Sequence, residues 1–220
     1  MSDPAAFVRA NTRLVAPPLV PEIELHLATE VLPLWRLTEE ELAQQGVPPP
    51  YWAFAWAGGQ ALARYLLDNP DLVRGAAVLD FGAGSGLVAI AAVLCGASAL
   101  AADIDIFATA ATALNAAANG CEGLETTNDD LIGGDIGWDV ILVGDMCYER
   151  PLAERLIAWL QRAAAAGKTV LLGDPGRSYF PKSGLEKLIG YGVAVSRDLE
   201  DREIRDTGVY RLLPRAEPSR

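Results

Sequence analysis

Apolar and polar positions along this chain fall into blocks that predict strands followed by helices. From residue 76 onward, short apolar runs that end at glycine or aspartate alternate with longer, alanine-rich stretches. The short runs are typical of buried strands, and the longer stretches, rich in the strongest helix former, are typical of helices. The predicted elements are strand 76–81, helix 86–94, strand 98–102, helix 106–118, strand 139–144, helix 151–165, strand 168–173, helix 183–190, and strands 192–198 and 204–213.

This alternation indicates an α/β fold with a mostly parallel sheet, because parallel strands need crossover helices and these cover both faces of the sheet. Only a short turn containing Glu200 and Asp201 separates the last two strands. We therefore expect those two strands to pair antiparallel at the edge of the sheet.

The first 57 residues are proline-rich and show no regular alternation. Thr38 and Glu41 have the spacing of a capping box at the start of a short helix. The short elements expected here and just beyond are strand 22–27, helix 38–45 and helix 59–67. We therefore divide the chain into an N-terminal cover segment, 1–57, and a main α/β domain, 58–220.

Composition limits the classes of partner. The 220 residues are 51% hydrophobic, which is ample for the core of one domain, and carry a net charge of -11 with a pI near 4.5. Such acidity argues against nucleic acid as a partner and favours a basic protein. Three cysteines without metal-ligand spacing predict neither a disulfide framework nor a metal site, so we expect a cytoplasmic protein. Residues 81–102 carry no charge, but glycines interrupt the run, so we expect no membrane span.

The most informative stretch is the strand that ends at Asp80 and leads into the glycines Gly82 and Gly84. In an open α/β sheet, ligands bind beyond the carboxyl ends of the strands, and glycines let the backbone approach them closely. The next strand ends at Asp103, whose carboxylate can accept hydrogen bonds from both ribose hydroxyls. Leu87 replaces the third glycine of the dinucleotide fingerprint, so we expect S-adenosylmethionine (AdoMet) as cofactor.

Two further acidic positions complete the predicted cofactor site. Asp80 would orient the glycine turn and the amino acid moiety of AdoMet, and Asp130 with Leu131 would meet the adenine. Asp105 competes with Asp103 for the ribose role, and Asp129 competes with Asp130.

The strand at 139–144 ends in Gly144, Asp145 and, three residues later, Tyr148. Gly144 would let the cofactor lie against the strand end. Asp145 could accept a hydrogen bond from an incoming ammonium group and align the amine after its proton leaves. Tyr148 could offer its ring face to the sulfonium or ammonium charge. A simpler interpretation of Asp145, that it caps the following helix, does not exclude this role.

These motifs give the chain a specific resemblance. It resembles the seven-stranded class I methyltransferases, and more narrowly the protein-lysine methyltransferases that carry a D-x-x-Y motif, matched by Asp145 to Tyr148. The runs at 50–56, 58–63, 103–105 and 129–131 are similar to bacterial relatives of the electron-transfer-flavoprotein β-subunit lysine methyltransferase, over a region from about residue 22 to the end. Ala57 departs from the proline expected after the tryptophan.

The resemblance implies a Rossmann-like, seven-stranded, mostly parallel sheet with its last strand antiparallel. It implies that 58–220 is the methyltransferase domain and that Asp145 and Tyr148 lie at the methyl-transfer end. The residues implied to touch AdoMet are Trp56, Gly82, Gly84, Asp103 and Gly144. The related enzymes that methylate planar nitrogens share an N-P-P-Y motif instead, and a carboxylate suits a cationic amine better than an amide does.

The expected function is methyl transfer from AdoMet to lysine side chains of a protein, with the electron transfer flavoprotein β subunit as substrate. The alternatives are another protein such as a ribosomal protein, a small amine, or a module that binds AdoMet or a nicotinamide cofactor without transfer. A triad or metal site built on His26, the single histidine, is disfavoured. Cys147 is expected to pack rather than react, and 173–177 is expected to be a turn that could contact substrate.

Overall fold

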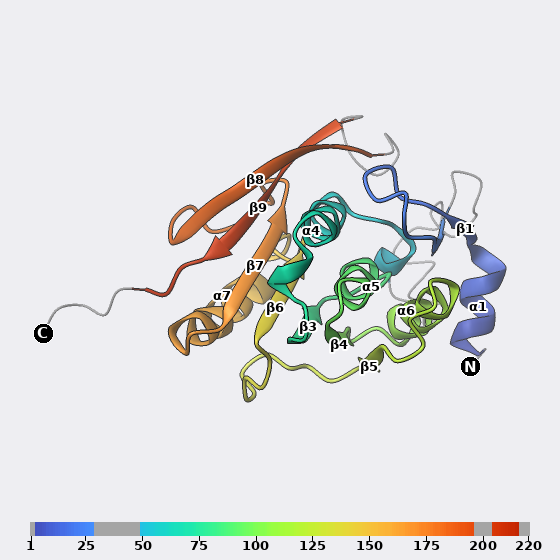
Figure 1. The fold of residues 1–220 in the computed structure, drawn as a ribbon, viewed down its shortest axis with the longest axis horizontal. Helices are drawn as coiled ribbons and strands as arrows, with labels where there is room; N and C mark the ends of the chain where they lie inside the picture. Colours follow the sequence, from blue (N-terminus) through green and yellow to red (C-terminus); the bar gives the residue numbers. More distant parts are fainter. Residues whose placement is uncertain (1–2, 29–48, 196–203, 216–220) are drawn as a thin grey trace, which may run out of the picture.

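The computed structural model describes residues 3–28, 49–195 and 204–215. Its centre is a seven-stranded sheet of order β5-β4-β3-β6-β7-β9-β8, shown in Figure 1. The first five strands in this order are parallel, and β9 is antiparallel to both of its neighbours. The strands are β3 (Ala77–Phe81), β4 (Ser98–Ala102), β5 (Glu125–Thr127), β6 (Val140–Gly144), β7 (Thr169–Asp174), β8 (Leu185–Ala194) and β9 (Ile204–Leu212). The predicted fold class, including the antiparallel last strand, is confirmed.

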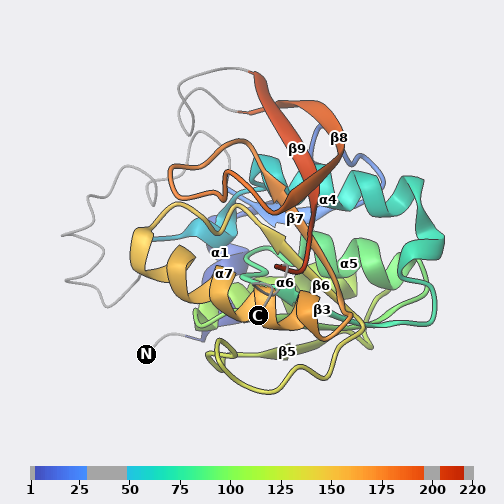
Figure 2. The same ribbon diagram turned by 90° about the vertical axis from the view of Figure 1, so that its left-hand side faces the viewer.

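Helices cover both faces of the sheet, as Figures 1 and 2 show. On one face, α4 (Ala57–Asp68) and α5 (Leu87–Leu94) share a core with Val78, Leu142 and Leu171 of the strands. On the other face, α7 (Arg150–Ala165) packs through Leu156, Trp159 and Leu160. Successive strand residues point to opposite faces, so the fully apolar runs read in the sequence serve both cores.

The segment before residue 29 adds elements that the sequence pattern does not predict. Helix α1 (Pro4–Asn11) begins after Asp3, whose carboxylate accepts a hydrogen bond from the Ala5 N–H group at 3.1 Å. Phe7 of this helix packs on Phe107 of α6 (Ile106–Ala118), with ring centroids 5.0 Å apart. A two-stranded sheet of β1 (Arg13–Val15) and β2 (Leu25–Leu27) follows, and β2 corresponds to the end of the strand expected at 22–27.

One predicted element is wrong, and one strand of the main sheet was not predicted. The helix predicted at 183–190 is wrong, because most of this segment belongs to β8, which pairs with β9 along nearly its whole length. The mixed apolar and charged residues at 185–189 fit the periodicity of a helix as well as that of a strand. Gly190 and Gly192 disfavour a helix beyond them. The sequence pattern also misses β5, a short and polar strand at the edge of the sheet. The helix predicted at 38–45 lies outside the described residues.

Residues 81–102 comprise the end of β3, the glycine turn, α5 and β4. Over the ranges that the structure describes, no helix combines the length and apolar character needed to span a bilayer.

Candidate active site

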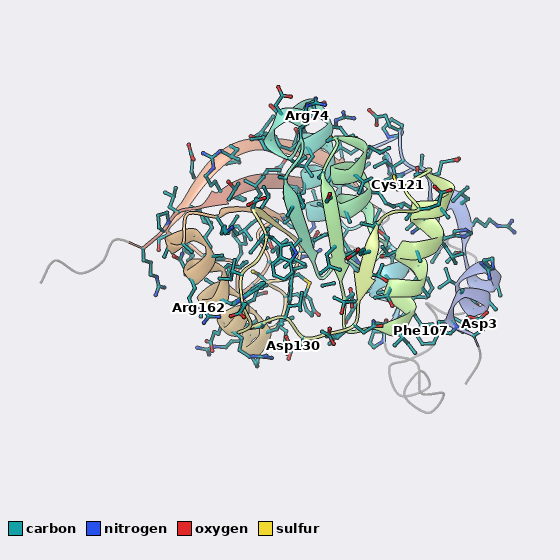
Figure 3. The ribbon with its side chains drawn as sticks, turned by 60° about the horizontal axis from the view of Figure 1, so that its bottom comes forward. Asp3, Arg74, Phe107, Cys121, Asp130 and Arg162 are labelled. Carbon is teal, nitrogen blue, oxygen red and sulfur yellow. The ribbon has the colours of Figure 1, made fainter. Side chains whose placement is uncertain are left out.

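The carboxyl ends of β4, β3 and β6 lie side by side and bring the predicted residues to one edge of the sheet. Phe81 is in register with Ala102 on one side and with Val143 on the other. The glycine turn, Asp103 and Asp145 therefore follow three neighbouring strands at the same edge. Figure 3 shows Arg74, which precedes β3, at the opposite end of the strands from Asp130.

The turn after β3 requires glycine. Gly82 and Gly84 have φ angles of +68° and +53°, a region that side chains with a Cβ rarely adopt. A Cβ at Gly82 would overlap the side chain of Met146, whereas one at Gly84 would meet only the Cα of Trp52, at 3.7 Å. The Gly84 N–H group donates to Oδ2 of Asp103 at 2.9 Å, so the turn is tied directly to the end of β4.

Asp103 keeps acceptor capacity that a ribose can use. Its Oδ2 accepts from Gly84 and its Oδ1 accepts from the Asp105 N–H group at 3.0 Å, so each oxygen retains a further lone pair. Burial raises the pKa of Asp103, and these two backbone N–H groups oppose the rise. Asp105 is used differently, because its carboxylate caps α6 by accepting from the Phe107 N–H group at 2.9 Å. The geometry thus favours Asp103 over Asp105 for the ribose.

Ile104 is a candidate binding residue that sequence reasoning missed. Its side chain is 75% exposed, the highest value among the large apolar residues described as exposed. An apolar surface directly after the ribose carboxylate is suited to the flat face of an adenine. The signal in the sequence was an isoleucine placed between two aspartates.

Asp130, predicted to meet the adenine, is engaged elsewhere. Its Oδ2 pairs with Arg155 of α7 at 2.8 Å, and its Oδ1 accepts from the Ile132 N–H group at 3.1 Å. The hydrogen bond from Arg155 lowers the pKa of Asp130. Each oxygen retains a further lone pair, so the contact of Asp130 and Leu131 with the adenine stays a prediction.

Asp80 lies beneath the glycine turn rather than in the open. It is 2% exposed and its Oδ2 accepts from the Ala89 N–H group of α5 at 2.9 Å. Burial raises the pKa of Asp80 from 3.8 to about 7, with Asp103 adding to the rise. Its carboxylate is therefore placed to hold α5 and the turn in position.

We expect the pKa of Asp80 to govern how stability depends on pH. Because the folded state holds this proton more tightly than the unfolded state, the free energy of unfolding should fall as pH rises from about 4 to about 7. Asp105 and Asp174, whose pKa values burial raises to about 6, act in the same direction. Asp80→Asn keeps the acceptor for Ala89 and should weaken this decline in urea unfolding at pH 5 and pH 8. The matched change at the exposed Asp71 should not, and equal slopes in both variants would refute the assignment.

Asp145 stands at the centre of the candidate methyl-transfer end. It is a non-glycine residue with φ +57°, 8% exposed, and its N–H group donates to the Gly173 carbonyl at 3.0 Å. Its Oδ1 accepts from Arg177 Nε at 3.1 Å and Nη2 at 2.8 Å, and its Oδ2 accepts from the Gly59 N–H group at 3.1 Å. Burial raises the pKa of Asp145, and Arg177 opposes the rise. Protein groups therefore already occupy both carboxylate oxygens.

Arg177 is the principal site residue that the sequence did not predict. It follows β7 in a turn held by Asp174, whose Oδ1 accepts from the N–H groups of Gly176 at 2.7 Å and Arg177 at 2.6 Å. The expected turn is thus present, and its arginine pairs with Asp145 while lying 5.4 Å from the ring centroid of Trp56. The pair forms because β6 and β7 are neighbours in the sheet. The sequence pattern around each strand does not reveal which strands are neighbours.

Gly144 packs closely against the first turn of α4. A Cβ at this position would lie 3.0 Å from the Gly59 backbone nitrogen, and one at Gly58 would lie 2.5 Å from Asp145 Oδ2. The N-terminus of α4 therefore sits directly on the ends of β6 and β7. This close approach is what brings the Gly59 N–H group to Asp145.

A row of aromatic rings leads away from the Asp145–Arg177 pair, beginning at Trp56. The Trp56 Nε1–H group donates to the Tyr51 carbonyl at 2.8 Å, and the two rings lie 6.1 Å apart. Tyr51 also packs against Tyr148, with ring centroids 5.8 Å apart. Burial raises the pKa of Tyr148, with smaller contributions from Tyr51, Glu149 and Asp103. The predicted residues Trp56, Asp145 and Tyr148 therefore belong to one connected cluster.

Cys147 and His26 have packing roles. Cys147 is buried, and this burial, more than its acidic neighbours, raises its pKa to about 12. His26 lies in β2, where its Nδ1 is 3.1 Å from Thr12 Oγ1 and its N–H group donates to Asn115 Oδ1 at 2.7 Å. Neither residue is placed for nucleophilic or acid–base chemistry.

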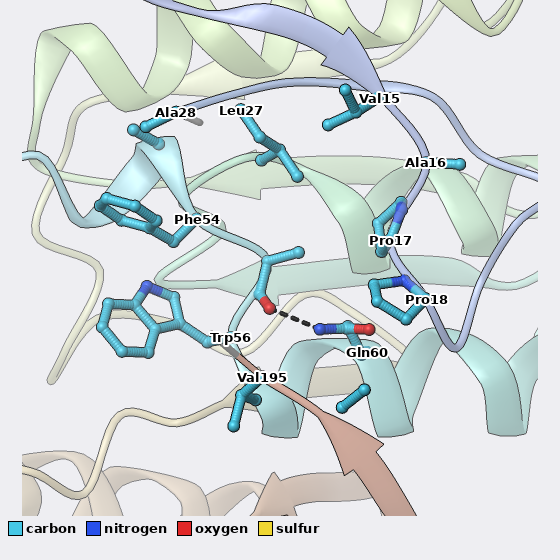
Figure 4. Close-up of a pocket in the computed structure, with 13 residues that line it drawn as sticks. Val15, Ala16, Pro17, Pro18, Leu27, Ala28, Phe54, Trp56, Gln60 and Val195 are labelled. Atoms are coloured by element: carbon cyan, nitrogen blue, oxygen red, sulfur yellow. Dashed lines mark hydrogen bonds between the residues drawn. The ribbon is translucent and has the colours of Figure 1, made fainter. Parts of the chain in front are cut away.

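Trp56 also lines an apolar cavity of about 290 Å³, shown in Figure 4. The other walls come from the N-terminal segment, α4 and the end of β8. Gln60 faces this space and donates through Nε2 to the Ala55 carbonyl at 2.6 Å. The cavity therefore adjoins the site through the tryptophan.

Comparison with known sequences shows the family of the chain. The chain is 42% identical over 218 residues to the electron transfer flavoprotein beta subunit lysine methyltransferase of Xenopus laevis, covering 96% of this chain and 87% of the relative. It is 39% identical to the Homo sapiens protein of the same name, covering 95% and 82%. Residues 61–144 match the family model described as ribosomal protein L11 methyltransferase (PrmA).

Solved structures share the fold. Magnesium protoporphyrin IX methyltransferase from Synechocystis, with bound SAM, has a TM-score of 0.52 at 17% identity and covers 70% of this chain and 77% of its own. An RNA methyltransferase from Salinibacter ruber, in complex with S-adenosyl-L-homocysteine, has a TM-score of 0.52 at 20% identity, covering 72% and 94%. Fold and site together define a methyltransferase of the seven-stranded, Rossmann-like class. The chain belongs to the family of electron transfer flavoprotein β subunit lysine methyltransferases.

Proposed function

We propose that the chain transfers the methyl group of AdoMet to lysine side chains of the electron transfer flavoprotein β subunit. The observation that carries the proposal is the convergence of the glycine turn, Asp103 and the Asp145–Tyr148 segment on one edge of the sheet. The names of relatives that match most of the chain support the substrate.

The residues at this edge fit AdoMet. The left-handed turn at Gly82 and Gly84 allows close approach of a ligand, Asp103 has lone pairs for two ribose hydroxyls, and Ile104 exposes an apolar face to an adenine. We propose that Trp56 and Gly144 complete this site, with Asp80 supporting the turn from below. Residues 1–57 would then form its cover, and 58–220 the methyltransferase domain.

When bound, AdoMet would supply a methyl group activated by its bond to a sulfonium, and the glycine turn, Asp103 and Ile104 would hold it. The lysine ammonium group would have to lose its proton to solvent before its nitrogen could accept the methyl group, and S-adenosylhomocysteine would then be released. The contribution of this chain is to orient the amine and to exclude water, so little acid–base machinery is needed. Asp145 and Tyr148 are the residues we place at the reacting end.

Incubation with labelled AdoMet and the flavoprotein subunits tests the proposal. We expect label on lysine of the β subunit, located by mass spectrometry of the product. Label on ribosomal protein L11 or a small amine, with none on the β subunit, would transfer the assignment to that acceptor. Binding of AdoMet without transfer to any protein of a lysate would support a noncatalytic module.

A further inference from the structure

Tyr51 is an exposed aromatic residue that the proposed mechanism does not yet use. Its side chain belongs to the short helix η1 (Tyr51–Ala53) and is 44% exposed. Tyr148, which is distant from Tyr51 in the sequence, is 43% exposed. The centroids of the two rings lie 5.8 Å apart, at an interplanar angle of 55°. Two partly exposed rings, inclined to each other, form a corner with two π-faces.

The corner is connected both to the glycine turn and to the Asp145–Arg177 pair. The Cα of Trp52, the next residue, is what a Cβ at Gly84 would meet, so η1 rests against the glycine turn. Tyr51 and Asp103 both contribute to the raised pKa of Tyr148. On the other side, the Tyr51 carbonyl holds Trp56, which stacks with Arg177. The backbone of Tyr51 is thus fixed by bonds that do not involve its ring.

The carboxylate of Asp145 leaves little capacity for the ammonium group itself. Three N–H groups, two from Arg177 and one from Gly59, bond its oxygens, and Arg177 compensates its charge. An ammonium group that reaches this edge therefore finds aromatic faces more accessible than a free carboxylate. Aromatic faces attract a cation without requiring a particular N–H geometry.

We propose that Tyr51 and Tyr148 together form the acceptor entrance, with Tyr51 as a specificity-determining residue that binds the aliphatic stem and cationic head of the lysine. The inference rests on the proposed function, because it assumes a lysine acceptor. The aromatic faces would recognise the acceptor lysine, and Asp145 would hold Arg177 and the Gly59 N–H group in position.

The test compares Tyr51→Leu and Tyr51→Phe with Tyr179→Leu, since Tyr179 is also 44% exposed. We expect Tyr51→Leu to lower kcat/KM for the β subunit about tenfold, mainly through KM, because one cation–π face is lost. Tyr51→Phe and Tyr179→Leu should stay within about threefold of wild type, since the Phe variant keeps the π-face and Tyr179 lies outside the Tyr51–Tyr148 pair. The affinity for S-adenosylhomocysteine should be unchanged in all three.

A binding measurement separates the contribution of the lysine ammonium group from that of its aliphatic stem. With S-adenosylhomocysteine present, a peptide spanning the labelled lysine should bind wild type more tightly than its norleucine analogue, and Tyr51→Leu should reduce that preference. The inference fails if Tyr51→Leu retains wild-type kinetics and preference, or if Tyr51→Phe loses as much as Tyr51→Leu. If wild type labels no lysine at all, it is the proposed function that fails.

Discussion

Asp145→Asn is expected to lower kcat by about a hundredfold, the loss that misplacement of the reacting groups by about 1 Å can cause. Asparagine tolerates the positive φ at this position and has the same size, so the change removes the charge and replaces one of the two acceptor oxygens by an amide NH2 group that faces an N–H donor. The variant would weaken the ion pair that fixes the Arg177 guanidinium beside Trp56, and the residues at the candidate methyl-transfer end would lose their fixed arrangement. Initial rates with the β subunit at saturating AdoMet measure the effect.

Binding of S-adenosylhomocysteine provides the control for this variant. The product lacks the sulfonium charge and should not sense the loss of the Asp145 charge, so its Kd should stay within about threefold of the wild-type value. If product affinity and kcat fall equally, Asp145 has been given the wrong role and belongs to the cofactor site. Asp139 is an exposed carboxylate at the opposite end of β6, so Asp139→Asn should leave kcat and the Kd for S-adenosylhomocysteine unchanged.

Gly58→Ala is expected to lower the free energy of unfolding by about 3 kcal/mol or more, at the upper end of the usual cost of overpacking. Its Cβ would overlap the Gly173 carbonyl and lie 2.5 Å from Asp145 Oδ2, so α4 would have to lift from the ends of β6 and β7. Because that movement would withdraw the Gly59 N–H group from Asp145, turnover should fall as well. Urea unfolding with a parallel rate measurement tests both effects.

Gly59→Ala is the matched control, one position along the same helix. A Cβ there would meet nothing closer than Val88 Cγ2, at 3.9 Å. Replacing a helical glycine by alanine without a clash should be neutral or stabilise by up to about 1 kcal/mol. Similar losses in the two variants would mean that the contact of α4 with the strand ends is looser than the structure has it.

Features that depend on local pattern and strand order were predictable from the sequence. The apolar runs that become β3, β6 and β7 are buried on both faces, so their short, continuous apolar composition favours strands, and β4 is buried only in its last two residues. Since parallel strands end at one edge, the residues after them had to come together. This is why the sequence alone predicts that the glycine turn, Asp103 and Asp145 lie at one edge of the sheet.

Features that depend on packing across the sheet were not predictable. The segment 185–189 takes its strand conformation from pairing with β9, a tertiary effect that overrides its ambiguous pattern. The pairing of Arg177 with Asp145 needs both the order of β6 and β7 and the turn that Asp174 holds. The close approach of α4 to Gly144 is likewise a packing feature, and the predicted contact of Gly144 with the cofactor stays a prediction.

Calorimetric titration with S-adenosylhomocysteine tests most directly whether the ends of β3 and β4 bind an adenosine through the Asp103 carboxylate. We expect wild type to bind in a one-to-one complex, Asp103→Ala to lose at least about tenfold in affinity with its ribose bonds, and NAD to produce no comparable heat. Tight NAD binding, or an affinity for S-adenosylhomocysteine that Asp103→Ala leaves intact, would contradict the account.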